Sequence, residues 1–192
     1  MNLPNSITLS RIASVPLLIW VLSPHFPFTG PNGEQELIAS GLFIAASITD
    51  GVDGYLARRR GQITTLGMLL DPLADKLLLV VVYVQCAWLN LVPWWLTAAV
   101  VARDCVIGLG ALTFRVWFGP LHGRPTAISK INTATQLLYV MLVLLGAGAG
   151  FPPREVLEAC ALITLATTVI SGAHYVNAFA RRAWTAPRAA LH

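Results

Sequence analysis

Long apolar stretches alternate with short polar breaks along the whole chain. A transmembrane helix needs about 20 mostly apolar residues to cross a hydrocarbon core about 30 Å thick. The breaks are rich in Pro, Gly and Asn, which end helices and form turns. They lie at 24–33, 59–65, 90–93, 119–125 and 146–153. The pattern therefore predicts six spans, approximately at 6–23, 35–57, 67–89, 93–115, 128–148 and 156–180.

Composition supports a membrane protein. Hydrophobic residues make up 56% of the chain and charged residues 11%, whereas about 25% of a soluble domain is charged. The mean hydropathy is +0.67. We therefore predict an all-α integral membrane protein of about six transmembrane helices, formed by residues 1–192 as a single domain. Pro4 and Asn5 favour a short N-terminal segment on the membrane surface before the first span.

Basic residues gather at one set of span ends, which the positive-inside rule places in the cytoplasm. They are Arg11, Arg58, Arg59, Arg60, Arg115, Arg124, Lys130, Arg181, Arg182 and Arg188. The other ends carry only Arg154 among the acidic residues Glu34, Glu36, Glu155 and Glu158. This asymmetry accounts for the net charge of +4, so we expect no nucleic-acid partner. We expect cytoplasmic termini and a location in the inner membrane of a bacterium.

Cysteine and histidine give no framework for a disulfide or a zinc site. Cys86, Cys105 and Cys160 fall in apolar stretches, and we expect them to be buried small hydrophobic residues. The histidines are scattered, and we expect none of them to be a metal ligand.

Four aspartates stand within residues 50–75 of a chain that is otherwise mostly apolar. Asp50 and Asp53 are three residues apart, and Asp71 and Asp75 are four apart, so each pair shares one face of a helix. Charged groups at membrane depth are costly, and four acids repel one another unless cations hold them together. Oxygen ligands favour hard ions such as Mg²⁺, Mn²⁺ or Ca²⁺. The spacing therefore predicts a divalent-metal site between two adjacent helices.

Small and basic residues in the same segment favour a phosphate or diphosphate substrate. Gly51, Gly54 and Gly67 allow a ligand to approach the backbone closely. Arg58 lies about one turn beyond Gly54 and brings positive charge to the same region. The alternative interpretation is that the charges only mark helix ends at the membrane interface.

The complete spacing of this segment resembles the signature of the CDP-alcohol phosphatidyltransferase family. It is Asp50-x2-Asp53-Gly54-x2-Ala57-Arg58, then eight residues, then Gly67-x3-Asp71-x3-Asp75, with every position occupied. Length and hydrophobic layout are similar over most of the chain. The resemblance implies CDP-diacylglycerol, or a similar CDP-linked lipid, as donor and CMP as leaving group. It also implies a homodimer.

The resemblance assigns roles to individual residues. Asp50, Asp53 and Asp71 are the expected principal ligands of two divalent cations, Mg²⁺ or Mn²⁺. Asp75 is expected to bind a metal or to act as general base. Pro4-Asn5-x2-Thr8-x2-Arg11 is similar to the entrance of the family's first helix, although Asn5 also suits ordinary helix capping. The expected CDP-binding residues are Asn5, Thr8, Gly54, Ala57, Arg58 and Gly67.

Charged residues also occur in the middle of the fourth span, at Arg103 and Asp104. Adjacent helical residues point about 100° apart, so these two need not pair with each other. We expect Arg103 to bind an anionic group of the acceptor. The alternative is a structural pair between helices.

A polar stripe opens the fifth span. Ser129, Asn132, Thr133 and Gln136 recur at helical spacing on an otherwise apolar helix. Such a stripe either lines a site or joins two helices by hydrogen bonds. Lys130 is a candidate to bind the phosphate of the acceptor, unless it only extends to the membrane surface.

Two acceptors stay open. Arg103-Asp104 and Ile128-Ser129-Lys130-Ile131-Asn132-Thr133 resemble cardiolipin synthases, which use phosphatidylglycerol. Asp71-Pro72-Leu73-Ala74-Asp75-Lys76 is shared with phosphatidylglycerophosphate synthases, which use glycerol 3-phosphate. We favour phosphatidylglycerol, with glycerol 3-phosphate as the alternative. A cation-coupled transporter is a more remote alternative, since intramembrane acids also serve ion transport.

Overall fold

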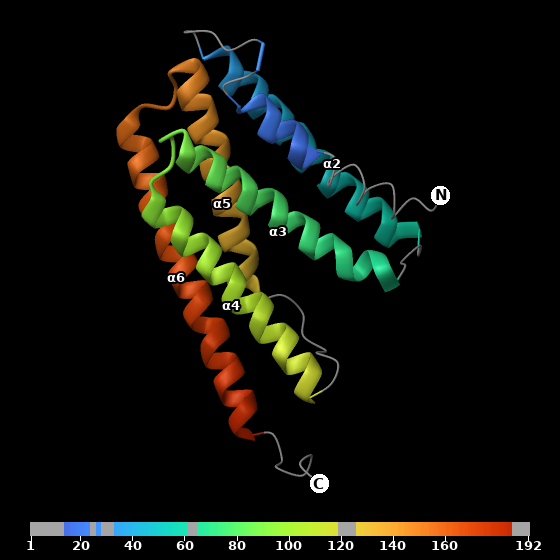
Figure 1. Cartoon of the computed structure of the whole chain (residues 1–192). Coiled ribbons are helices and arrows are strands. Elements are labelled where there is room, and N and C mark those ends of the chain that lie inside the picture. Colours follow the sequence, from blue (N-terminus) through green and yellow to red (C-terminus); the bar gives the residue numbers. More distant parts are fainter. Residues whose placement is uncertain (1–13, 24–25, 28–32, 61–64, 119–125, 186–192) are drawn as a thin grey trace.

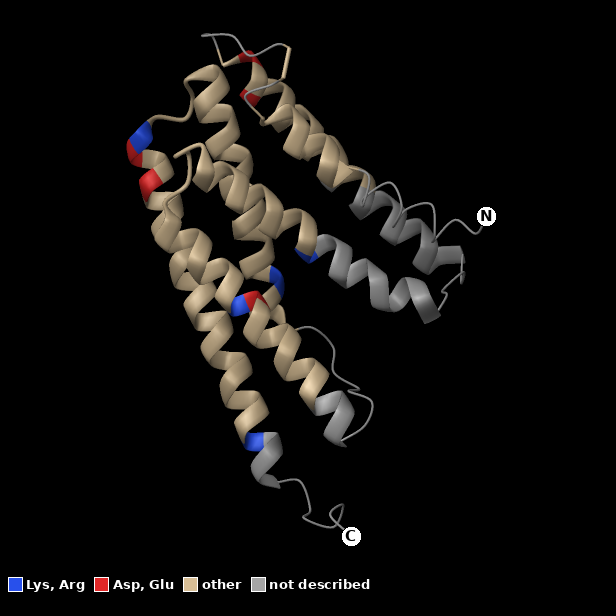
Figure 2. Ribbon diagram, in the orientation of Figure 1, with Lys and Arg blue, Asp and Glu red and all other residues tan. Residues whose placement is uncertain are grey.

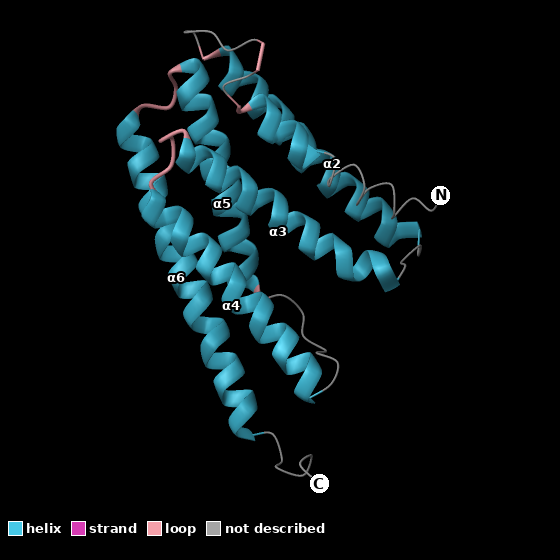
Figure 3. Ribbon diagram, in the orientation of Figure 1, coloured by secondary structure: helices cyan, strands magenta, loops and turns pink. Residues whose placement is uncertain are grey.

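The computed structural model describes residues 14–23, 26–27, 33–60, 65–118 and 126–185. Side chains are described in these ranges except at 47, 50–60, 65–75, 114–118 and 182–185. Every regular element within the described ranges is a helix (Figure 3), which confirms the predicted all-α class. A helical segment at 14–21 precedes α2 (Glu34–Arg60), α3 (Thr65–Trp88), α4 (Trp94–Phe118), α5 (Ala127–Ala149) and α6 (Arg154–Thr185).

Three of the described helices are long and apolar enough to cross a membrane. These spans are Trp94–Thr113, Ala127–Ala149 and Arg154–Arg181. Lys76–Trp88 within α3 is a shorter apolar segment. Six transmembrane helices therefore stay a prediction, and the predicted N-terminal interfacial segment lies largely outside the described residues.

The fifth helix is longer than predicted. The expected break at 146–153 begins only at Gly150, which has the left-handed conformation (φ 71°) that often ends a helix. Its N–H donates a 3.1 Å hydrogen bond to the carbonyl of Gly146 and so caps α5. Glycine adopts positive φ without steric cost, so the sequence ends α5 at this point.

Helix α5 packs against both α2 and α6, while α4 packs against α6 and α3 (Figure 1). The core combines large apolar side chains from separate helices, with Phe43, Tyr83, Leu96 and Leu144 at most 1% exposed. Outward-facing positions are also apolar, including Leu109 and Leu162. Apolar residues on both the inner and outer faces are typical of helices that lie in lipid.

A close contact joins the start of α2 to the end of α5. Gly33 has φ 74°, and a Cβ atom there would lie 2.7 Å from the Cα of Gly148. A Cβ on Gly148 would in turn lie 2.7 Å from the Cγ of Leu37. Glycine at both positions therefore lets the two backbones meet without side chains between them.

The beginnings of α2 and α6 lie at the same end of the described bundle (Figure 1). Figure 2 shows that acidic residues are concentrated at this end. The only described cation among them is Arg154, whose Nε lies 3.4 Å from Glu158 Oε1. A further group of charged residues lies closer to the middle of the bundle, where a membrane protein carries few ionised side chains.

The cysteine prediction is correct for one residue and wrong for another. Cys86 is buried, Cys160 is half-buried and Cys105 is exposed, and all of them are free thiols. Cys105 follows the buried pair Arg103 and Asp104 on α4. Because each helical residue turns by about 100°, Cys105 points outward from the bundle although its segment is apolar.

Candidate functional site

The predicted metal ligands lie on two consecutive helices. Asp50 and Asp53 belong to α2, and Asp71 and Asp75 belong to α3. Their side chains lie outside the described ones, so their convergence on a metal stays a prediction. The same holds for the predicted CDP-binding residues: the side chains of Gly54, Ala57, Arg58 and Gly67 are not described, and Asn5 and Thr8 precede the described ranges.

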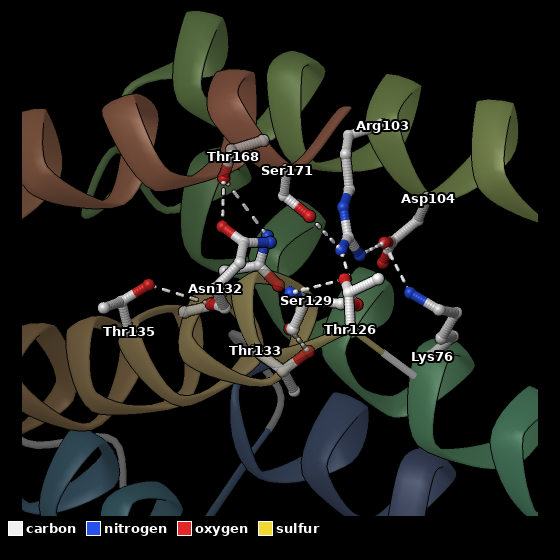
Figure 4. A network of polar contacts seen from close by, with 11 residues as sticks. Lys76, Arg103, Asp104, Thr126, Ser129, Asn132, Thr133, Thr135, Thr168 and Ser171 are labelled. Carbon is white, nitrogen blue, oxygen red and sulfur yellow. Dashed lines mark hydrogen bonds and ion pairs between the residues drawn. The ribbon is translucent and has the colours of Figure 1, made fainter. Parts of the chain in front are cut away.

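Directly after Asp75, the first described side chain of α3 belongs to a partly buried ionic contact. Lys76 Nζ lies 2.5 Å from Asp104 Oδ1 on α4 (Figure 4). The same oxygen accepts a 2.6 Å hydrogen bond from Nη1 of Arg103. The side chains of Arg103 and Asp104 are 3% and 5% exposed, whereas that of Lys76 is 38% exposed. The contact is therefore closed on the α4 side and open on the Lys76 side.

Arg103 extends this contact to two more helices. Its Nη2 atom donates to Ser129 Oγ on α5 at 2.9 Å and to Ser171 Oγ on α6 at 2.6 Å (Figure 4). The aliphatic part of Arg103 passes Gly172 of α6, where a Cβ atom would make an ordinary contact of 3.5 Å with Arg103 Cγ. We call Lys76, Arg103, Asp104, Ser129 and Ser171 the Arg103 cluster.

Within the described side chains, the Arg103 cluster carries more positive than negative charge, and some of its hydrogen-bonding atoms are unused. It holds two cations and one carboxylate, a formal net charge of +1. Arg103 Nε and Asp104 Oδ2 are buried and have no hydrogen-bond partner among the side chains that the structure describes. The buried cation Arg103 already has Asp104 as counter-charge, so the excess positive charge is available at the partly exposed Lys76. This arrangement suits an anionic ligand that enters from the Lys76 side.

Next to this cluster, polar side chains join α5 to α6. Asn132 and Gln136 of α5 are fully buried, and both contact Thr168 of α6. The Thr168 hydroxyl donates to Asn132 Oδ1 at 2.9 Å and accepts from Gln136 Nε2 at 3.3 Å. Thr135 and Thr167 lie 3.0 Å apart through their hydroxyl oxygens. We call these residues the α5–α6 seam.

The structure divides the predicted polar stripe of the fifth span. Ser129 faces Arg103, and Asn132 and Gln136 join helices, which was the alternative interpretation of the stripe. Thr133 is exposed, and among the described residues its hydroxyl bonds only the carbonyl of Ser129 in its own helix. Lys130 is also exposed, so the structure does not bring it into the Arg103 cluster.

Arg103 and Asp104 do pair with each other, although adjacent helical residues need not do so. This pair lies within α4, whereas the alternative of a pair between helices corresponds to the contact of Lys76 with Asp104. Among the described residues, Arg103 Nε has no hydrogen-bond partner. Sequence reasoning missed Lys76, Ser171 and Thr168. Spacing offered a clue, because Thr164, Thr168 and Ser171 recur at intervals of four and three and are all buried.

A family model described as CDP-alcohol phosphatidyltransferase matches residues 1–170. The chain belongs to this family. It is 30% identical to cardiolipin synthase (CMP-forming) of Rattus norvegicus over 91% of the chain, and it spans 61% of that relative's length. It is 34% identical to the CDP-diacylglycerol–glycerol-3-phosphate 3-phosphatidyltransferase of Bacillus subtilis, with 75% of the chain and 77% of the relative covered. The enzyme of that name from Pectobacterium atrosepticum is 31% identical over 92% of the chain and 94% of its own length.

These relatives in the CDP-alcohol phosphatidyltransferase family carry two kinds of name, one that gives cardiolipin as product and one that gives glycerol 3-phosphate as acceptor. Identity is similar for both kinds of name, so it favours neither acceptor for this chain. The matched region includes every described residue of the Arg103 cluster except Ser171.

Proposed function

We propose that this membrane protein transfers the phosphatidyl group of CDP-diacylglycerol to a glycerol-containing acceptor and releases CMP. Family membership supports the reaction class, and the complete spacing of Asp50, Asp53, Asp71 and Asp75 supports its metal dependence. We propose the inner membrane of a bacterium as the location, with the active site facing the cytoplasm, and a homodimer as the assembly.

The donor set fits two divalent cations, Mg²⁺ or Mn²⁺. Four carboxylates supply oxygen ligands, and the positions on α2 and α3 keep each pair on one helix face. When bound, the cations supply charge stabilisation at the diphosphate. Asp50, Asp53 and Asp71 would hold them, with Asp75 as a further ligand or as the base.

The remaining groups bind and orient the substrates. The acceptor hydroxyl attacks the lipid-side phosphorus and forms the new oxygen–phosphorus bond, while the bond to the bridging oxygen breaks and CMP leaves. Asp75 takes the hydroxyl proton. Gly54, Ala57, Arg58 and Gly67, together with Asn5 and Thr8, would line the CDP site.

The Arg103 cluster supports binding of the acceptor's phosphate close to Asp75. Lys76 follows Asp75 on α3 and is partly exposed, so its charge is available to a substrate. The formal charge of +1 matches the single charge of the phosphodiester in phosphatidylglycerol, whereas glycerol 3-phosphate is a dianion near neutral pH. We therefore favour phosphatidylglycerol as acceptor and cardiolipin as product. Lys130, on the exposed face of α5, would add charge near the membrane surface.

A competition between acceptors tests this proposal. The purified chain, in bilayers that lack phosphatidylglycerol, receives labelled CDP-diacylglycerol and each acceptor separately, and mass spectrometry identifies the lipid product. We expect CMP release with cardiolipin from phosphatidylglycerol and little product from glycerol 3-phosphate. Phosphatidylglycerophosphate as the main product would overturn the acceptor assignment and keep the reaction class. Absence of CMP release with every acceptor would overturn both.

A further inference from the structure

One carboxylate oxygen holds two cations of the Arg103 cluster together. Asp104 Oδ1 accepts from Lys76 Nζ at 2.5 Å and from Arg103 Nη1 at 2.6 Å. The two cations come from different helices, α3 and α4, and they repel each other. Without Asp104, nothing among the described side chains would keep Lys76 beside Arg103.

We propose that Asp104 is a positioning residue, which sets the places of Lys76 and Arg103 for the acceptor's phosphate without touching the substrate. The inference rests on the proposed function. The Asp104 side chain is 5% exposed and carries a negative charge, so it repels a phosphate and does not bind it directly. Its effect on substrate therefore passes through Lys76 and Arg103.

The position of Lys76 in α3 gives this contact a second consequence. Lys76 and Asp75 are neighbours on one helix, in which residues are about 1.5 Å apart along the axis. A helix moves as a rigid element over so short a distance. The tie to Asp104 therefore also limits how far Asp75 moves relative to α4.

Simple electrostatics and positioning predict opposite results when Asp104 loses its charge. Asp104→Asn raises the formal charge of the cluster from +1 to +2. If charge alone governed binding, an anionic acceptor would bind more tightly. If Asp104 positions the two cations, their mutual repulsion separates them and the acceptor binds less tightly. The sign of the change in KM therefore separates the two explanations.

The test compares steady-state kinetics of the full chain and its variants in lipid bilayers. We expect Asp104→Asn to raise KM for phosphatidylglycerol about tenfold, the scale of coupling between contacting residues. KM for CDP-diacylglycerol should change much less. Glu158→Gln is the matched control, because it removes the carboxylate of an exposed ion pair near the start of α6, away from the Arg103 cluster. It should leave the KM values for acceptor and donor unchanged. An unchanged or lower acceptor KM in Asp104→Asn would overturn the proposal.

Two further variants keep the test decisive. Lys76→Arg preserves the charge, so a purely electrostatic role predicts no change, whereas positioning predicts a raised acceptor KM because the donor geometry differs. The Lys76 side chain is 38% exposed, so we expect Lys76→Arg to fold even if Asp104→Asn does not. The double variant Lys76→Gln/Asp104→Asn should lose less than the sum of the two single losses, since both changes break the contact of Lys76 with Asp104, and only Asp104→Asn also releases Arg103. Additive losses would contradict the proposal, and the wild-type acceptor assay separately tests the reaction itself.

Discussion

Arg103 and Ser171 lie 68 residues apart in the chain, and Arg103 Nη2 donates a 2.6 Å hydrogen bond to Ser171 Oγ. The contact joins α4 to α6, and the same nitrogen also donates to Ser129 on α5. Asp104 and the two serines lie on different sides of Arg103. The planar guanidinium can bond all of them at once, because it directs N–H groups from both of its terminal nitrogens. The acceptor end of the proposed site thus depends on the shape of this side chain as much as on its charge.

Replacement of Arg103 by lysine should test this dependence. An ammonium group cannot reproduce the fork, so Arg103→Lys should lose at least one serine contact and weaken acceptor binding by about 1–2 kcal/mol. Acceptor KM in the bilayer assay measures this effect. Arg154→Lys is the matched control, because Arg154 is exposed at the other end of α6. Equal kinetics for Arg103→Lys and the wild type would show that only the charge matters.

The four aspartates should each be required for activity. Asp50→Asn, Asp53→Asn, Asp71→Asn and Asp75→Asn keep the side-chain size but remove a metal-binding charge or the base. We expect each to lower turnover at least about a hundredfold. Removal of divalent metal by a chelator should abolish CMP release, and Mg²⁺ or Mn²⁺ should restore it. A folded single variant with nearly normal turnover would remove that residue from its assigned role.

The α5–α6 seam should contribute to stability. Thr168→Val removes the hydroxyl that bonds Asn132 and Gln136, which have no other side-chain partner across the seam. Unfolding in detergent should show a loss of about 1–2 kcal/mol, because the variant loses two hydrogen bonds between membrane helices, each worth roughly 0.6 kcal/mol or more. Thr133→Val is the control, since its exposed hydroxyl bonds only its own helix, and it should change stability by less than about 0.5 kcal/mol. The same loss in both variants would contradict a specific role for the seam.

The glycine contact between α2 and α5 should tolerate no added methyl group. A Cβ on Gly148 would meet Leu37 Cγ at 2.7 Å and the Gly33 carbonyl oxygen at 2.8 Å. Gly148→Ala should therefore cost about 1–3 kcal/mol of unfolding free energy. Gly41→Ala on α2 is the control, because no atom lies within 4 Å of its added Cβ. Alanine favours helix by up to about 1 kcal/mol over glycine, so the control should be neutral or stabilising.

The proposed topology is open to labelling from each side of the membrane. In a variant without the native cysteines, Gln62→Cys should react with a membrane-impermeant thiol reagent only after the membrane is permeabilised. Phe151→Cys, at an exposed position between α5 and α6, should react in intact cells. The expectation follows from the basic residues at alternate span ends. Reaction of position 62 from outside would reverse the orientation and the proposed access of the nucleotide.

The sequence predicted the helices well where apolar length alone decides their bounds. The fourth span was expected at 93–115 and the helix is Trp94–Phe118; the fifth was expected at 128–148 and the helix is Ala127–Ala149. Hydrophobic length does not, however, determine how neighbouring helices are rotated about their axes. Cys105 shows the difference, because its apolar surroundings in the sequence suggested burial while its actual direction is outward.

The partners within the candidate site were less predictable for the same reason. Arg103 was singled out as an intramembrane cation, but its contacts depend on the relative rotation and shift of α4, α5 and α6. Lys76 looked like a residue of a shared sequence motif, and only the packing of α3 on α4 shows its contact with Asp104. The four aspartates were recognisable from spacing alone, because both members of each pair lie on one helix.

The α5–α6 seam also bears on how the chain enters the membrane during synthesis. Helix α5 leaves the ribosome before α6, and at that moment Asn132 and Gln136 have no Thr168 to bond. Amide groups without partners are costly in hydrocarbon, so α5 alone is a poor candidate for early release into lipid. We therefore expect α5 to stay beside the insertion machinery until α6 follows, so that the two helices enter the bilayer as a pair. The seam would thereby couple the membrane insertion of two consecutive helices.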